Sequence, residues 1–164
     1  MKDYQQERIL TFLNPERDPL GRGYQITQAI IAVGSGGFFG RGLGLGPQSQ
    51  LHFLPEARTD FIFSVLAEEL GFLGVLFLFS LYLFLFYRIF KIAKSTYDNF
   101  GLFLILGLGL SLFSQIFINS SVNLGLLPIT GISLPFLSYG GSALIVNLMA
   151  MGILASIVRY RAKG

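Results

Sequence analysis

Two long tracts without a charged residue limit what this chain can fold into more than any other feature of its sequence. No charged residue occurs in 70–87, and neither a charged residue nor a histidine occurs in 99–158. Charged residues make up 13% of the whole chain, compared with about 25% in soluble domains. A helix needs about 20 mostly apolar residues to cross the hydrocarbon core of a bilayer. The first tract can therefore supply one such helix, and the second tract two.

These tracts predict three transmembrane helices, near residues 70–89, 100–118 and 142–158. A helix is the expected form, because every backbone amide and carbonyl in the bilayer core must be hydrogen-bonded within its own segment. The sequence thus predicts an all-α polytopic membrane protein with two regions. Residues 1–69 form a large outer loop with short interfacial helices. Residues 70–164 form the three-helix region, which ends in a cytoplasmic C-terminus.

Basic residues give the three helices their orientation. The loop at 118–142 carries no charge, whereas the first and third predicted helices are followed by Arg88, Lys91, Lys94, Arg159, Arg161 and Lys163. Lys and Arg near helix ends stay preferentially on the cytoplasmic side. We therefore expect the uncharged loop and everything before residue 70 to lie outside. Contact with membrane lipid headgroups accounts for the net charge of +3, so we expect no nucleic-acid partner.

The outer region is expected to be rich in turns and to hold one interfacial or re-entrant helix. Residues 26–40 are apolar but too short to cross a membrane, and we predict a helix there that ends at Gly34. The glycines of 34–46 lack the flanking strand and the GK[ST] ending of a phosphate loop, which predicts a flexible loop with close backbone approach. His52 has no partner at metal-ligand spacing and is interpreted as a surface residue.

Two further expectations concern chemistry and completeness. The chain has no cysteine, which excludes disulfides and thiol nucleophiles. Residues 1–25 lack the apolar core of a signal peptide, although the predicted topology requires this polar segment to have crossed the membrane. We therefore expect further membrane spans before it.

The segment "DFIFSVLAEEL" begins with Asp60 and predicts a helix. Thr59 or Asp60 is placed to cap that helix, and a catalytic carboxylate at Asp60 is the alternative. At 3.6 residues per turn, Asp60, Ser64 and Glu68 share one stripe, which we expect to face outward at the membrane surface. Glu68 and Glu69 can equally form the solvated edge of the first span.

Three stretches, at 3–44, 48–74 and 125–145, resemble the SEDS family of polytopic membrane proteins, which polymerise peptidoglycan glycan in bacterial elongation, division and sporulation. They read "DYQQERILTFLNPERDPLGRGYQITQAIIAVGSGGFFGRGLG", "QSQLHFLPEARTDFIFSVLAEELGFLG" and "GLLPITGISLPFLSYGGSALI". They cover nearly the whole chain in the family's order. "QSQLHFLPE" resembles the elongation members more than the division members. Family members have about ten spans, and this chain resembles their C-terminal part.

The resemblance implies a site residue and a reaction. Asp60 falls on the family's essential acidic residue, which lies on the extracytoplasmic face of the bacterial cytoplasmic membrane. As the general base, it would help the C4 hydroxyl of a lipid II acceptor to attack a polyprenyl-pyrophosphate-linked glycan with inversion. Arg58 stands where the family commonly has His, and its charge is expected to lower the pKa of Asp60. Burial beside Phe61 and Phe63 is expected to raise it.

The leaving pyrophosphate and the uncharged loop supply the remaining candidates. Arg58 and a divalent cation, Mg²⁺ or Mn²⁺, would balance the pyrophosphate charge. Glu56 can hold that cation, or it can pair with Arg58 at the surface. The loop motif "SYGGS" offers either sugar and headgroup contacts or an ordinary tight turn through Ser138, Tyr139, Gly140 and Gly141.

Two other functions stay open. A flippase or transporter for lipid-linked precursors usually carries ionisable groups within its spans, and the three predicted spans have none. A membrane scaffold would present the family's partner, a class B penicillin-binding protein that acts as a single-span transpeptidase. We expect the three spans alone to be inactive, because their helices would expose faces meant for the rest of a bundle.

Overall fold

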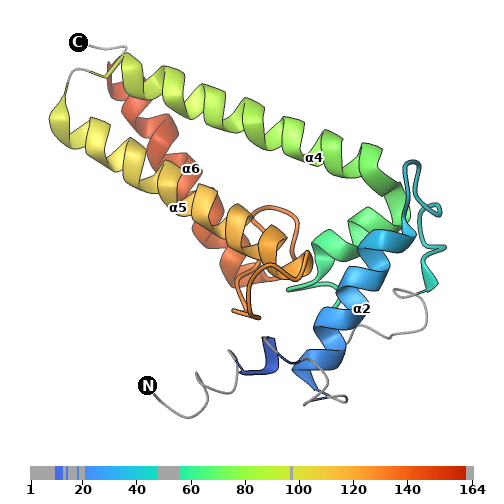
Figure 1. Cartoon of the computed structure of the whole chain (residues 1–164). Coiled ribbons are helices and arrows are strands. Elements are labelled where there is room, and N and C mark those ends of the chain that lie inside the picture. The colour runs from blue at the N-terminus through green and yellow to red at the C-terminus, as the bar shows by residue number, and fades with distance from the viewer. Residues whose placement is uncertain are drawn as a thin grey trace.

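The computed structural model describes residues 10–12, 14, 18, 21–47, 56–96 and 98–161. Within those ranges the regular structure is helical and contains no strand, so the predicted all-α class is confirmed. The four long helices are α2 (Arg22–Ser35), α4 (Ile62–Lys94), α5 (Asn99–Asn123) and α6 (Gly141–Arg161). Figure 1 shows α4 and α5 as two long rods, with α6 beside α5 and α2 packed across the N-terminal end of α4.

Three of these helices are long and apolar enough to cross a membrane, as the sequence predicts. They are Ile62–Lys94, Asn99–Asn123 and Gly141–Arg159, with mean hydropathies of 2.3, 2.1 and 2.0. The chain is therefore a multi-pass membrane protein. The second helix continues five residues past its predicted end at 118, because the polar run "NSSVN" stays helical and buries its side chains against the start of α4.

Helix α4 breaks at Gly71, where φ is 65° and ψ is −162°. This backbone conformation belongs to glycine and separates residues 62–70 from the long membrane-length part. The helix breaks here because its main chain packs directly against the main chain of the glycine-rich loop at 36–45. We call this contact the joint. A Cβ at Gly71 would collide with the main chain of Gly40, and a Cβ at Gly40 would collide with the main chain of Glu69 and Leu70.

Four main-chain hydrogen bonds hold this joint between the loop and α4. Arg41 N donates to Glu68 O and Gly42 N to Glu69 O, both at 3.0 Å. In the opposite direction, Phe72 N donates to Gly37 O and Leu73 N to Phe38 O, at 3.0 and 3.2 Å. The predicted close backbone approach is thus confirmed. The loop is anchored at the break rather than free, which corrects the prediction of a flexible loop.

The predicted short helix at 26–40 is present as α2, but it begins earlier, at Arg22, and ends at Ser35. Its small residues Ala29 and Ala32 are fully buried and pack with Phe61 and Val122. α2 contacts both α4 and α5. Helix α2 therefore packs against the segment that leads into α4 and stabilises its position.

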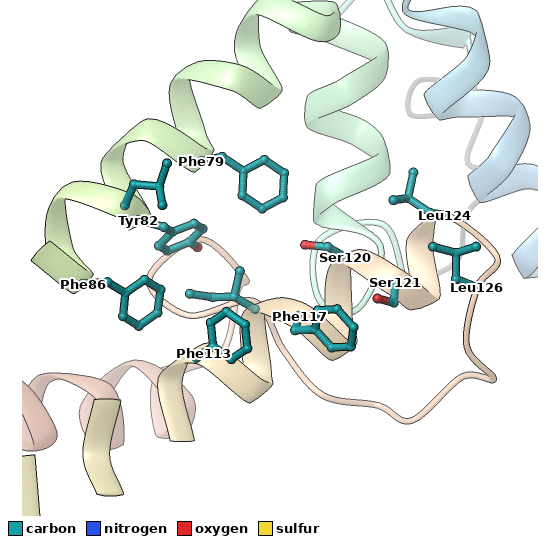
Figure 2. Close-up of a pocket in the computed structure, with 11 residues that line it drawn as sticks. Phe79, Tyr82, Phe86, Phe113, Phe117, Ser120, Ser121, Leu124 and Leu126 are labelled. Carbon is teal, nitrogen blue, oxygen red and sulfur yellow. The ribbon is translucent and has the colours of Figure 1, made fainter. Parts of the chain in front are cut away.

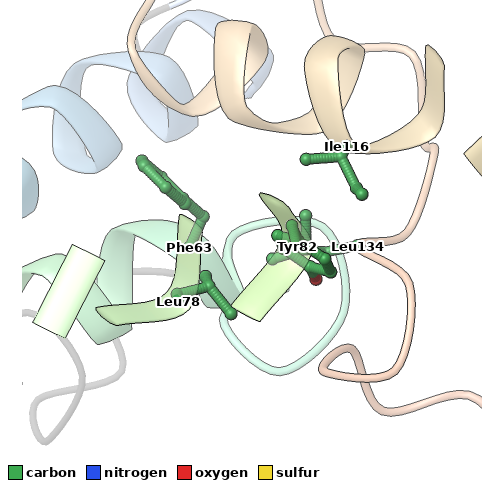
Figure 3. Packing of buried hydrophobic residues seen from close by; sticks show 5 residues of the cluster. All are labelled: Phe63, Leu78, Tyr82, Ile116 and Leu134. Atoms are coloured by element: carbon green, nitrogen blue, oxygen red, sulfur yellow. The ribbon is translucent and has the colours of Figure 1, made fainter. Parts of the chain in front are cut away.

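A second core cluster joins both parts of α4, α5 and the loop that leads to α6. It contains Phe63, Leu78, Tyr82, Ile116 and Leu134. Figure 3 shows Ile116 of α5 pointing toward Leu134 of the loop and Tyr82 of α4. The Tyr82 hydroxyl donates a 2.7 Å hydrogen bond to the carbonyl oxygen of Pro135. This cluster fixes the loop against α4 and α5.

The polar stripe predicted on the first part of α4 faces inward, so the prediction that it faces outward is wrong. Ser64 and Glu68 are both 0% exposed. The stripe packs against the end of α5, where Ser64 hydrogen-bonds to Asn123. Burial also contradicts the alternative that Glu68 forms a solvated edge of the first span. Residue spacing within one segment shows which side chains share a face, but it does not show that α5 packs against that face.

Candidate active site

Asp60 lies directly before α4, but its carboxylate does not cap the helix. The N-cap residue is Phe61, and no side chain makes a capping hydrogen bond there. The hydroxyl of Thr59 donates to Glu56 Oε2 at 2.7 Å instead. The capping prediction for Thr59 and Asp60 is therefore wrong. The Asp60 carboxylate is not used for the commonest structural task of an aspartate at a helix start.

Two asparagines of α5 hold the main chain of Asp60. Asn119 Nδ2 and Asn123 Nδ2 each donate a 2.9 Å hydrogen bond to the Asp60 carbonyl oxygen. Asn119 Nδ2 also donates to Ile132 O at 2.8 Å, which ties the loop before α6 to the same point. Both side chains are buried, with Asn123 fully so. The position of Asp60 is thus set through its backbone and not through its carboxylate.

Asn119 and Asn123 are site residues that the sequence analysis missed. They lie four residues apart, hence on one face of a helix, at the end of an otherwise apolar span. Buried polar residues within membrane helices usually have a functional role. That spacing was the available signal, but placing the end of the span at 118 assigned both residues to the loop.

Burial and charge both shift the acidity of Asp60. Its half-buried position raises the pKa of the carboxyl above the ordinary value for aspartate, and the negative charge of Glu56 raises that pKa further. Arg58, which the sequence analysis expected to lower the pKa, is not among the causes. A carboxylate with a raised pKa is a stronger base, which suits proton abstraction from a hydroxyl.

The predicted surface pair between Glu56 and Arg58 does not form. Among the residues that the structure describes, no ion pair joins their side chains, and Glu56 Oε2 accepts from Thr59 instead. The side chains of Glu56 and Arg58 are both exposed. Both charges therefore remain accessible to a ligand.

The predicted loop residues lie against the segment before Asp60. Ser138 Oγ donates to Thr59 O at 2.7 Å and accepts from Leu134 N at 2.8 Å. Tyr139 N donates to Arg58 O at 2.8 Å. The Ser138 hydroxyl therefore anchors the loop, with its one proton already donated within the protein. Residues about 80 positions apart in the sequence meet here.

One pocket of about 490 Å³ unites five of the predicted residues. It is lined by Arg58, Ser138, Tyr139, Gly140 and Gly141, with apolar side chains that include Ile62 and Leu144. The Tyr139 side chain is 80% exposed. Glu56 and Asp60 lie outside the lining of this pocket. The pocket offers one cation and backbone groups to an anionic or polar ligand.

An apolar pocket of about 330 Å³ lies between α4 and α5. In Figure 2, Phe79 and Phe86 of α4 face Phe113 and Phe117 of α5, with Ser120 at one side. Apart from the Tyr82 hydroxyl and two serines, its lining is hydrocarbon. A space of this kind suits a lipid chain rather than a polar substrate.

The residues at the site also bear on the expected cation. Within the described ranges, no group of three or more His, Cys, Asp or Glu side chains could hold a metal ion. Mg²⁺ is commonly bound through one or two carboxylates together with substrate phosphates and water. Glu56, whose side chain is exposed, offers one such carboxylate. His52 lies outside the described residues.

The sequence matches the FtsW, RodA and SpoVE protein family, described as "Cell cycle protein", over residues 1–163. It is 52% identical to the peptidoglycan glycosyltransferase MrdB of Escherichia coli K12, over 98% of this chain and 44% of that protein. It is 50% identical to a probable peptidoglycan glycosyltransferase FtsW of Geobacter sp. strain M18, over 95% of this chain and 42% of that protein.

The fold also resembles a solved structure described as "Structural coordination of polymerization and crosslinking by a peptidoglycan synthase complex". The TM-score is 0.74 at 39% sequence identity, and the match covers 100% of this chain and 44% of that one. The chain thus spans less than half the length of each of these three proteins.

Proposed function

Because this chain belongs to the FtsW, RodA and SpoVE family, we propose that it carries the catalytic end of a peptidoglycan glycan polymerase in the bacterial cytoplasmic membrane. The observation that carries the proposal is the state of Asp60. Its carboxyl is half-buried, has a raised pKa and caps no helix, while two asparagines fix its main chain. The basic residues that follow the first and third spans favour a position of Asp60 on the extracytoplasmic face.

The reaction needs one base and one stabilised leaving group. Asp60 takes the proton from the C4 hydroxyl of the lipid II acceptor sugar while that oxygen attacks the anomeric carbon of the growing glycan. The bond between the anomeric carbon and the pyrophosphate oxygen breaks, and the configuration inverts. Pyrophosphate leaves without being protonated if cations balance its charge, so a second carboxylic acid is not required.

Arg58 is the residue placed to meet the pyrophosphate. Its side chain is exposed, forms no ion pair with Glu56, and lines the pocket with Tyr139, Gly140 and Gly141. When bound, a divalent cation would supply further positive charge, and Glu56 would hold it. The donor sugar and its lipid carrier would then lie on opposite sides of the pyrophosphate.

The proposal extends to a partner and a process. A structural relative is described as coordinating polymerisation and crosslinking within one peptidoglycan synthase complex. A class B penicillin-binding protein, which crosslinks the strands, is therefore the proposed partner of the full-length protein. The stretch "QSQLHFLPE" favours a role in cell-wall elongation and shape maintenance.

The test compares D60N and D60A with the wild type in lipid II polymerisation by the full-length protein. General-base catalysis typically contributes about 10²- to 10⁴-fold, so both variants should lose at least 10²-fold in rate while staying folded. The matched control is D98N, since Asp98 caps α5 through Gly101 N and Asn caps equally well. A folded D60N protein with near-normal polymerisation would refute the proposal.

A flippase predicts a different result from the same variants. Lipid II translocation in vesicles, measured beside glycan product on gels, separates the two functions. Translocation that depends on Asp60 without any glycan product would favour transport. A scaffold predicts that D60N keeps both partner binding and cell-wall synthesis.

A further inference from the structure

A second polar pocket, of about 500 Å³, lies where α5, the outer loop and the start of α6 meet. Gln115 of α5, Ser133 of the loop, and Ser142 and Asn147 of α6 contribute its polar side chains. None of the predicted site residues lines it. Its volume falls within the usual range for small-ligand sites.

Asn147 is the most informative residue of this pocket. Its side chain is 4% exposed and lies within the apolar helix α6. Within the part of the chain that the structure describes, its amide makes no hydrogen bond, and its polar atoms are not sealed off from the pocket. Amides in protein interiors are nearly always hydrogen-bonded, because leaving one unpaired is costly. The Asn147 amide is therefore available to a ligand that enters the pocket.

The chemistry of the lining indicates the class of that ligand. The polar side chains are two amides and two hydroxyls, which can both donate and accept, and no charged residue lines the pocket. A pyrophosphate would require cations, and a hydrocarbon chain would require an apolar lining. A neutral group rich in hydroxyls and amides fits best, as in an N-acetylated pyranose.

The pocket also lies beside the carboxylate of Asp60. Gly131 is part of its wall, and a methyl group added to Gly131 would lie 3.8 Å from Asp60 Oδ2. Gly131 has φ of 74°, a conformation that favours glycine. No side chain therefore projects from position 131 between the pocket and the carboxylate. A sugar in the pocket can place a hydroxyl toward Asp60.

We propose that this pocket is the acceptor-sugar subsite, in which the Asn147 amide hydrogen-bonds the 2-acetamido group and the C4 hydroxyl faces Asp60. The subsite rests on the proposed function and makes it specific. The acceptor is recognised by its neutral acetamido sugar, separately from the pyrophosphate near Arg58. Gln115 and Ser133 supply further contacts to the sugar hydroxyls.

The experiment measures polymerisation by full-length N147L protein with two acceptors. One is lipid II, and the other is a lipid II analogue in which a hydroxyl replaces the 2-acetamido group of the acceptor sugar. For lipid II, N147L should lower kcat/KM about 10- to 100-fold, mainly through KM, because the acetamido group loses its partner. For the analogue, N147L should change kcat/KM little.

The control is S114A, because Ser114 lies outside the pocket and donates only to Ser111 O one turn earlier. This variant should behave as the wild type with both acceptors. Leu at 147 should preserve or raise thermal stability, since an apolar residue suits a membrane helix better than an unpaired amide. A fall in thermal stability together with equal losses for both acceptors would show a structural role and overturn the proposal.

Binding measured without turnover separates the subsite from the reaction. Lipid II binding to D60N and to D60N/N147L proteins should differ about 10- to 100-fold, whether or not the wild type polymerises. Equal binding by the two proteins would reject the subsite while leaving the proposed function intact. Loss of binding with N147L in a protein that makes no glycan would reject the polymerase and keep the sugar site.

Discussion

Ser64 and Asn123 lie 59 positions apart in the chain and meet in a buried hydrogen-bonded contact. Asn123 Oδ1 accepts from both the amide and the hydroxyl of Ser64, at 3.1 and 2.7 Å. The other end of the same amide donates to the Asp60 carbonyl oxygen. One side chain of α5 therefore fixes the first turn of α4 and the main chain of the proposed base together.

We predict that N123L is among the most damaging single substitutions near the site. It leaves the Ser64 amide without its acceptor in a fully buried position, which costs about 1–3 kcal/mol for each buried group left unpaired. Thermal unfolding should show a clear loss of stability, and polymerisation should fall at least tenfold. N99L is the matched control, because Asn99 is exposed at the start of α5. Equal unfolding temperatures for both variants would contradict this account.

The pH profile of polymerisation should respond to Glu56. A general base must be deprotonated, so activity falls as pH drops through its pKa. Burial and Glu56 both raise the pKa of Asp60, and the acid limb should therefore lie above the range of an ordinary aspartate. E56Q removes the smaller of the two causes and should move the acid limb to lower pH. A shift to higher pH would mean that Glu56 acts on Asp60 in another way.

Stability should depend on Asp60 with a defined sign. A carboxyl whose pKa is higher in the folded than in the unfolded protein destabilises the fold once pH rises above both values. D60N should therefore be slightly more stable than the wild type near neutral pH, and the difference should shrink as pH falls through the folded pKa. Unfolding temperatures measured across acidic and neutral pH test this prediction, which a constant difference would contradict.

Gly71 should not tolerate a side chain. Alanine there would have to adopt φ of 65° and would collide with the main chain of Gly40, and the backbone strain alone costs about 1–3 kcal/mol. G71A should lower the unfolding temperature and expose the joint to limited proteolysis. The control is G107A, because Gly107 lies within α5 and an added Cβ meets nothing within 4 Å. A G71A protein as stable as G107A would show that the break can straighten.

The loop that carries Tyr139 should depend on Tyr82. Y82F removes the buried 2.7 Å hydrogen bond to Pro135 O and leaves that carbonyl unpaired, a loss of about 1–2 kcal/mol. We expect lower thermal stability and a modest fall in kcat. Y87F is the control, since Tyr87 lies on the same helix and is 60% exposed.

The sequence predicted the membrane helices well because charge-free length is a property of single segments. The helical class and the three spans follow from that length alone. The catalytic role of Asp60 was predicted through the resemblance to a family, and the loop at 138–141 was proposed from its residue types. What each of them touches depends on helices far apart in the chain, which no local pattern encodes.

The errors share that cause. Thr59 and Asp60 have the residue types of helix caps, yet the first-turn amide of Ser64 donates to Asn123 Oδ1 of α5 instead. The stripe of Ser64 and Glu68 was assigned outward because periodicity shows which residues share a face and not what the face meets. Asn147 shows the same limit, since only the structure reveals that its side chain is largely buried and lines a pocket.

Asn119 and Asn123 hydrogen-bond to the Asp60 carbonyl oxygen and not to its carboxylate. This arrangement has a genetic consequence. A subunit with D60N keeps its shape and its surfaces, and so it should still enter assemblies with its partners. Expressed beside the normal copy, it would occupy those assemblies without extending a strand. We therefore expect such an allele to be dominant over the wild type, whereas N123L, which loosens the scaffold itself, should be recessive.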